Sequence, residues 1–183
     1  MSDTDSDGAL MARVAGGDAG AFDRLAARHM RRVVALAQRM TGNPSDADEI
    51  AQDAFLRVWQ HAARWDGARA AFTTWLYRIV VNLAIDRGRR PGWDPLEAAG
   101  ELPDSAPDAV AQIAERQTAA LVNRALDALP DRQRAAVVLF HQEGLSLKQA
   151  AEILGMNETA FASLLARARA ALKTALAAGR MPS

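Results

Sequence analysis

The sequence contains no cysteine, and its histidines are few and scattered. Without thiols it has no disulfide framework, no thiol nucleophile and no cysteine-type zinc site. His29, His61 and His141 lie far apart and form no HxxxH pair, which argues against a histidine metal site. We therefore expect no metal and no cofactor.

Long apolar runs are also missing. No stretch approaches the roughly 20 apolar residues of a membrane span, and the acidic start (Asp3, Asp5, Asp7) is unlike a signal peptide. Nor does the sequence offer a nucleophile–base pair or a phosphate-binding loop. We expect a cytoplasmic protein that does not insert into membranes and has no catalytic activity of its own.

Helix-forming residues dominate what is present, mainly Ala, Leu, Arg, Glu and Gln, which predicts an all-α protein. Four of the seven prolines fall between Arg90 and Ala109. Proline and glycine prevent a long helix there, so we expect a flexible, acidic linker at 91–111 between two small helical domains, at 10–90 and 112–178. The sequence leaves open whether the two domains pack together.

The net charge is zero, but the charges are unevenly distributed. Acidic residues and no Lys or Arg occur between 91 and 115, whereas bases and no acids occur between 161 and 180. A third block, 78–90, carries four arginines against Asp86 alone. Local fields attract phosphate, so neutrality overall does not exclude nucleic acid. Each basic block alone is weak evidence, because most are simply solvated helix faces.

Three helices are expected in the N-terminal half. Asp18 begins the first, and 41–44 ends it. Ser45 is expected to cap the second, which buries one face and exposes Glu49, Gln52 and Asp53. That buried face is expected to hold Ala47, Ile50, Ala51, Ala54, Phe55, Val58 and Trp59. A loop at 63–71 leads to the third helix, at about 72–89.

Two of these helices carry candidate binding surfaces. The acidic patch of the second suits docking to a basic partner, although a solvated helix face is the better explanation of these residues taken alone. The third combines aromatic residues, Asn82 and arginines, which suits single-stranded or flipped bases better than duplex. Core packing is the better explanation for Trp75 and Ile79, but not for Asn82, Arg87 and Arg90.

The C-terminal half ends in a helical hairpin at 145–173. A helix at 111–129 and a second that opens with Pro130 and closes at Gly144 precede it. Ser146 and Gln149 form a capping box, Gly155 ends the first hairpin helix and Asn157 caps the second. Phe161, Leu165, Ala168, Leu172 and Leu176 form an apolar stripe on the last helix. The spacing fits either a DNA-binding helix–turn–helix or an ordinary corner of a helical bundle.

Four segments in order carry a family resemblance. Segments 46–59 and 72–87 resemble the second conserved region of bacterial sigma factors, and 128–134 and 144–172 resemble the fourth. Their order is similar to that of the extracytoplasmic-function (ECF) group of the sigma-seventy family, which lacks the third-region domain. The resemblance covers about 18–176. It implies a protein that binds core RNA polymerase, directs it to promoter DNA, and is controlled by an anti-sigma factor.

The resemblance also implies roles for residues of the N-terminal half. Glu49, Gln52 and Asp53 match the family residues that dock on the clamp helices of the polymerase's largest subunit. The loop at 65–73 matches the one that captures a flipped base of the minus-ten element, where a preformed pocket favours the melted state. The residues implied at this element are Trp65, Arg69, Phe72, Thr73, Arg78, Asn82, Asp86, Arg87 and Arg90. The acidic linker resembles the segment that threads the polymerase's RNA channel.

The hairpin matches the reader of the minus-thirty-five element. The residues implied there are Lys148, Asn157, Ser163, Arg167, Arg169 and Lys173. Ala162, Leu164 and Ala166 occupy positions where many members carry basic or aromatic residues, so we expect phosphate contacts and shape readout to dominate. Glu158 is better explained by the helix dipole than by a cytosine contact.

Two non-catalytic alternatives remain from the sequence. A sigma mimic that only sequesters a regulatory protein would need no DNA surface, yet both basic blocks are present. A one-component repressor would explain the hairpin but not the N-terminal half.

Overall fold

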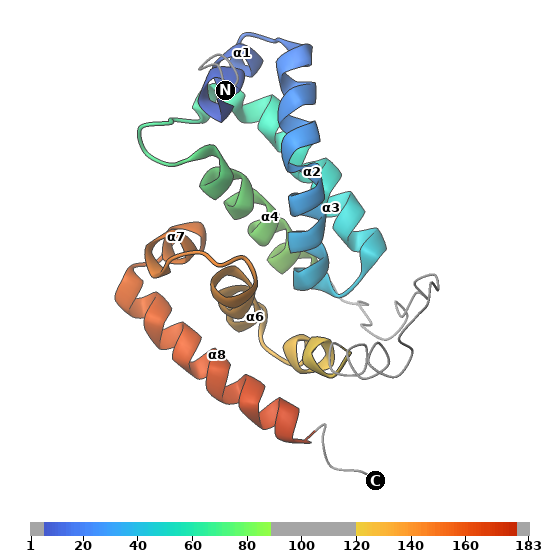
Figure 1. The fold of residues 1–183 in the computed structure, drawn as a ribbon, viewed down its shortest axis with the longest axis vertical. Helices are drawn as coiled ribbons and strands as arrows, with labels where there is room; N and C mark the ends of the chain where they lie inside the picture. The colour runs from blue at the N-terminus through green and yellow to red at the C-terminus, as the bar shows by residue number, and fades with distance from the viewer. Residues whose placement is uncertain (1–5, 89–119, 179–183) are drawn as a thin grey trace, which may run out of the picture.

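The computed structural model describes residues 6–88 and 120–178, and all regular elements within these ranges are helical. The N-terminal helices are α1 (Asp7–Ala15), α2 (Ala19–Thr41), α3 (Pro44–His61), the short 3-10 turn η2 (Ala62–Arg64) and α4 (Phe72–Gly88). Figure 1 shows α2, α3 and α4 side by side, with α1 across their upper end. The sequence reading missed α1, which begins before the expected domain boundary at residue 10.

Local capping explains where these helices begin and end. Asp18 is the N-cap of α2, and its side chain accepts a hydrogen bond from the Ala21 N–H at 2.9 Å. Gly42 ends α2 in the left-handed conformation, with φ 70°. The expected Ser45 cap is wrong. Asn43 caps α3 instead, accepting from the Ser45 N–H at 2.9 Å, because Pro44 fits the first helical position, where no N–H is needed.

The C-terminal helices are a helix at 120–127, α6 (Asp131–Val137), α7 (Leu147–Ile153) and α8 (Glu158–Ala178). Pro130 is the residue before α6 rather than its first residue, a shift of one position. A π-helical turn, η4 (Val138–Gln142), continues α6, and the sequence did not predict this turn. Gly144 follows in the left-handed conformation, with φ 67°. Arg90, the expected linker at 91–111 and the start of the helix expected at 111 lie outside the described residues.

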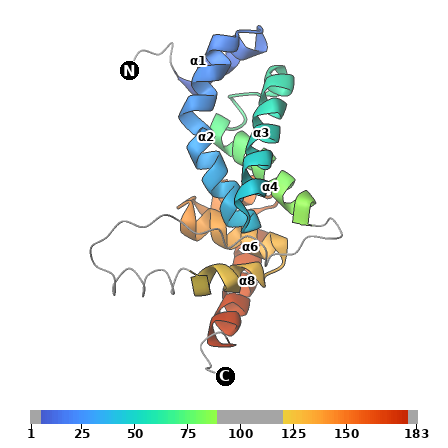
Figure 2. The ribbon, with the colours of Figure 1, turned by 90° about the vertical axis from the view of Figure 1, so that its right-hand side faces the viewer.

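The N-terminal and C-terminal helices pack against each other (Figures 1 and 2). α4 contacts α6 and α7, and α2 contacts α6 and η4. Buried apolar side chains from both halves, such as Leu76 and Val80 of α4 and Ile153 of α7, belong to one core cluster. Within the described residues the two halves therefore pack together in a closed arrangement. This answers the question that the sequence left open.

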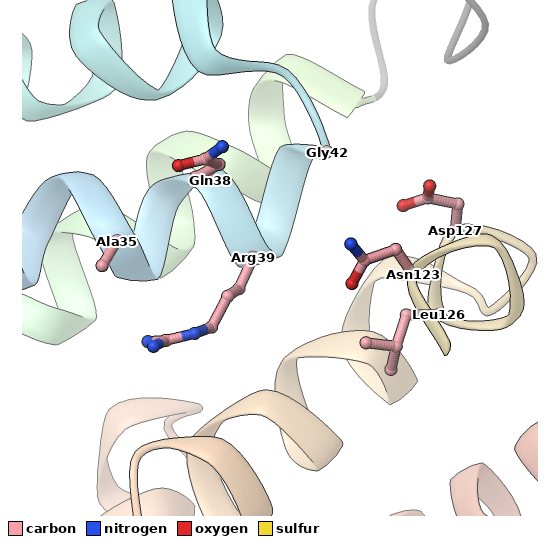
Figure 3. Close-up of a pocket in the computed structure, with 7 residues that line it drawn as sticks. All are labelled: Ala35, Gln38, Arg39, Gly42, Asn123, Leu126 and Asp127. Carbon is pink, nitrogen blue, oxygen red and sulfur yellow. The ribbon is translucent and has the colours of Figure 1, made fainter. Parts of the chain in front are cut away.

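Charged side chains contribute to this junction. Arg134 of α6 is only 3% exposed and donates to the Met40 carbonyl of α2 at 2.7 Å. Glu143, which follows η4, pairs with Arg39 of α2. A cavity of about 260 Å³ lies between α2 and the helix at 120–127. Figure 3 shows Arg39 and Gln38 on its α2 side, across from Asn123, Leu126 and Asp127.

Candidate polymerase and promoter interfaces

The acidic face of α3 is open to solvent. Glu49, Gln52 and Asp53 are all exposed, because the opposite face of α3 packs on α2 and α4. Residues buried on that opposite face are Ala47, Ile50, Ala51, Ala54, Phe55 and Val58. The predicted division of α3 into a buried and an exposed face is confirmed for these residues.

Trp59 departs from this division. It was expected on the buried face, yet it is 39% exposed, and Leu56 on the same helix is 52% exposed. The Trp59 and Phe22 rings pack edge to face, with centroids 5.3 Å apart, which anchors the indole at the rim of the core. The exposed face of α3 is therefore an acidic patch continued by two large apolar side chains.

Arg87 joins this face to the end of α4. Its two terminal nitrogens lie 2.5 Å from Asp46 Oδ1 and 2.7 Å from Glu49 Oε2. Hydrogen bonding to Glu49 raises the pKa of the guanidinium, with Asp46 adding to the effect. Arg87 was expected to contact minus-ten DNA, but here its charge is held by two carboxylates. One of them, Glu49, is a predicted docking residue.

The loop between α3 and α4 positions Trp65 beside α1 and the start of α4. Its ring centroid lies 6.3 Å from that of the buried Phe72. A Cβ on Gly67 would lie 2.9 Å from the indole, so this glycine is needed for the ring to fit. The Trp65 Nε1 is buried without a hydrogen-bond partner. The loop thus holds a preformed aromatic site, while Arg69 remains free of the core with its side chain 88% exposed.

His29 supports the same site from α2. It is buried, its ring lies 5.2 Å from that of Phe72, and its Nε2 lies 2.9 Å from Asp7 Oδ2 of α1. Asp7 also pairs with Arg28 at 2.6 Å. The role of α1 was missed, although Ser6 as a cap and Leu10, Met11 and Val14 as a buried stripe were readable signals.

Along α4, Arg78, Asn82 and Asp86 recur every four residues and are all exposed. They form one polar strip along the helix. Thr73 and Tyr77 belong to another face, where they line a cavity of about 240 Å³ with Glu143, Gln149 and Ile153 of the C-terminal helices. The predicted minus-ten residues are therefore divided between an open strip and a covered face.

The predicted caps of the two hairpin helices, α7 and α8, are confirmed. Ser146 accepts from the Gln149 N–H at 3.2 Å, and the Gln149 side chain accepts from the Ser146 N–H at 3.0 Å, completing the capping box. Gly155 has φ 66°. Asn157 accepts from the Ala160 N–H at 2.8 Å, so its side chain is engaged in capping α8.

The outer face of α8 presents Ser163, Arg167, Arg169 and Lys173 to solvent, and Lys148 is exposed on α7. Leu164, which the resemblance placed among DNA-facing positions, is 8% exposed and belongs to the core. It follows the buried Phe161 by three residues, a helical interval that brings both to one face. Arg169 donates to His141 Nε2 at 3.0 Å and lies over the Phe140 ring.

Within residues 6–88 and 120–178, no group of three or more His, Asp or Glu side chains lies close enough together to hold a metal ion. None of the helices there has the length and apolar character needed to cross a membrane.

Comparison with known families agrees with the geometry. The Sigma-70 region 2 family matches residues 25–94, and the Sigma-70, region 4 family matches residues 119–172. The chain is 42% identical over 169 residues to the ECF RNA polymerase sigma factor SigM of Mycobacterium tuberculosis, covering 91% of this chain and 83% of SigM. It is 36% identical to the RNA polymerase sigma factor CnrH of Cupriavidus metallidurans, covering 96% of this chain and 97% of CnrH.

A solved structure of a sigma factor has a similar fold. The fold resembles that of CnrH in complex with the cytosolic domain of CnrY, with a TM-score of 0.67, 32% identity and coverage of 92% of this chain and 96% of that one. The chain therefore belongs to the ECF group of the sigma-70 family, whose members bind core RNA polymerase and promoter DNA to initiate transcription.

Proposed function

We propose that the exposed face of α3 is the surface by which this sigma factor docks on the clamp helices of core polymerase. Glu49, Gln52 and Asp53 supply the polar contacts, and Leu56 and Trp59 extend the surface. Exposed acids beside partly exposed apolar side chains suit a basic partner helix, because charge selects the partner and apolar burial adds affinity. This solvent-exposed composite face is the observation that carries the proposal.

The promoter contacts are assigned to two further surfaces. For the minus-ten element these are the polar strip of Arg78, Asn82 and Asp86, and the aromatic site of Trp65. An indole held by its surroundings offers a stacking face to an extruded base without first losing conformational freedom. Asn82 can hydrogen-bond a base edge, which makes it the residue of the strip suited to base preference.

For the minus-thirty-five element, the outer face of α8 supplies Ser163, Arg167 and Lys173. The neighbouring Ala162 and Ala166 are exposed but too short to reach base edges. Contacts to phosphate therefore position this helix, and DNA shape contributes more than direct base readout.

Control by an anti-sigma factor is part of the proposal. It is supported by the similarity to CnrH, which is solved in complex with the cytosolic domain of CnrY. The proposal assigns this chain no catalytic step. Because its partner is the transcribing polymerase, it also places the chain in the cytoplasm.

The docking face is best tested with Asp53→Lys. Glu49 pairs with Arg87, so reversing its charge also disturbs α4, whereas no hydrogen bond or ion pair of Asp53 occurs within the described residues. We expect Asp53→Lys to weaken binding to purified core polymerase at least tenfold while the melting temperature stays unchanged. Asp23→Lys, on an exposed position of α2, is the matched control. Equal affinity of both variants and the wild type would exclude the docking role.

A further inference from the structure

One side of α2 carries a row of exposed arginines, which spans much of the length of the N-terminal helices (Figures 1 and 2). These residues are Arg24, Arg28, Arg31, Arg32 and Arg39. At about 100° per residue, all five project within an arc of about 100°, so they form a single arginine stripe. Asp23 is the only acid of α2, and it projects about 130° away from the centre of the stripe. The stripe is therefore a surface of one charge sign.

Most of this charge is not neutralised by the protein itself. Arg28 pairs with Asp7 of α1 at 2.6 Å, and Arg39 pairs with Glu143. Arg24, Arg31 and Arg32 have no hydrogen bond or ion pair within residues 6–88 and 120–178. Like charges three or four residues apart repel each other on a helix, and a solvated surface ordinarily mixes both signs. The stripe is thus suited to an anionic partner.

The surroundings of the stripe favour phosphate over an acidic protein. A protein interface has an apolar core, for which α3 supplies Leu56 and Trp59. Among the described residues, the exposed large apolar side chains are those two and Leu147, so α2 contributes none. Nucleic-acid interfaces are instead polar and strongly basic, and a guanidinium binds phosphate oxygens through two parallel hydrogen bonds.

The length of the stripe fits a nucleic-acid strand. From Arg24 to Arg39, α2 rises about 22 Å at about 1.5 Å per residue. A DNA strand carries one phosphate about every 3.4 Å of helix axis, so the stripe spans about six phosphates. It is long enough to contact several phosphates of one strand.

The stripe also lies beside the surface proposed for minus-ten DNA. α2 packs against α4, and Arg32 lines a cavity together with Thr73 and Tyr77 near the start of that helix. Arg28 precedes the buried His29, whose ring packs against Phe72 next to Trp65. The phosphates that flank a base held at the aromatic site are therefore within reach of α2.

Resting on the proposed minus-ten contacts, we propose that the arginine stripe of α2 is an additional DNA-binding surface. It contacts phosphates that flank the minus-ten element without reading their sequence. Contacts of this kind position the protein on DNA and raise its affinity, but carry no base preference. Arg24 and Arg31 are the residues to test, because their loss breaks no ion pair among the described residues.

The salt dependence of DNA binding counts these contacts. The full chain is titrated against a fluorescent duplex of random sequence over a salt series. Each phosphate contact on duplex DNA contributes about 0.9 to the slope of log K against log salt concentration. Arg24→Gln with Arg31→Gln should therefore reduce the magnitude of the slope by about 1.8, and weaken binding at 100 mM salt by about tenfold or more.

Two matched variants separate this contact from general damage. Arg24→Lys with Arg31→Lys keeps both charges and should keep the wild-type slope. Arg13→Gln with Arg124→Gln removes the same charge from exposed positions outside α2, and should change the slope little. Circular dichroism should show the same helix content in all variants.

The absence of cysteine allows the stripe to be located on a promoter. Ala27→Cys is exposed at the edge of the stripe and accepts an iron chelate that cleaves nearby DNA. In holoenzyme assembled from the labelled chain and core polymerase, cleavage should fall beside the minus-ten element. Cleavage at another place, or none, would contradict the assigned position.

Three results of the titrations would overturn the inference. They are no measurable duplex binding by the wild type at 50 mM salt, an unchanged slope in the glutamine pair, and an equal loss in the control pair. Weaker binding of the glutamine pair to core polymerase, at an unchanged DNA slope, would assign the stripe to a protein partner instead. Failure of wild-type holoenzyme to transcribe from any promoter of a random library would overturn the proposed function, whatever the slopes of the free chain.

Discussion

Replacing Arg134 with methionine should destabilise the protein strongly. The guanidinium donates to the carbonyls of Met40 at 2.7 Å, Leu126 at 3.0 Å and Asp127 at 2.8 Å. These carbonyls belong to the last turns of α2 and of the helix at 120–127, which have no partner within their own helices. One side chain therefore satisfies the ends of two helices at once.

The size of the effect comes from the acceptors that remain. Methionine fills a similar volume but donates no hydrogen bond, and backbone acceptors cannot be removed by substitution. A buried polar group left unsatisfied costs about 1–3 kcal/mol. The Leu126 carbonyl keeps a hydrogen bond from the Leu129 N–H at 3.0 Å, so the Met40 carbonyl is the buried acceptor that loses its donor. We therefore expect the free energy of unfolding to fall by about 2 kcal/mol. For a chain of this size, that lowers the melting temperature by about 4–8 °C.

Thermal and urea unfolding followed by circular dichroism measure this loss. The matched control is Arg132→Met in the same helix, since Arg132 is exposed and makes a single bond to the Leu154 carbonyl at 3.0 Å. The control should lose less than about 1 kcal/mol. Equal losses for the two variants would refute the capping role of Arg134.

Three further outcomes are expected. Gly42→Ala should cost about 1–2 kcal/mol in urea unfolding, because φ is 70° and the added Cβ would lie 3.2 Å from Asp127 Oδ1, whereas Gly20→Ala in a helix should not destabilise. Arg167→Ala should weaken minus-thirty-five binding for all sequences alike and reduce the salt slope by about 1 in a titration series. Burial, with Glu143 nearby, raises the pKa of Tyr77 above its ordinary 10.0. Its stabilising contribution is therefore complete below pH 10 and lost as pH rises through the raised pKa, so Tyr77→Phe should flatten the loss of stability at high pH.

Features that depend on neighbours in sequence were predictable. Asp18, Ser146 and Asn157 cap helices in the structure because a cap requires only a side-chain oxygen and the next few backbone N–H groups. Ser45 fails within this class because Asn43 and Pro44 compete for the same helix start. The exposed face of α3 followed from helical periodicity, which relates residues three and four apart.

Features that depend on distant partners were not predictable. Arg87 meets Asp46 and Glu49 only because α4 ends beside the start of α3, and no periodicity in either segment reveals that crossing. Glu143 and Arg39 are likewise brought together by the packing of the two halves. Trp59 was misplaced because its spacing from Phe55 puts it near the core, whereas its packing against Phe22 of α2, which the periodicity of α3 does not reveal, leaves the side chain 39% exposed.

The position of Arg87 shows how a neutral chain can serve both polymerase and DNA. Surface fields fade over about 8 Å at physiological ionic strength, so each partner senses a local face rather than the net charge. The acids of α3 and the bases of α8 belong to different helices, and Arg87 lies where the acidic face of α3 meets α4, the helix proposed to contact minus-ten DNA. Arg87 of α4 forms an ion pair with Glu49, which is a predicted polymerase contact on α3. If α3 is the docking face, as proposed, then docking there and the orientation of α4 are physically linked through the Arg87 guanidinium.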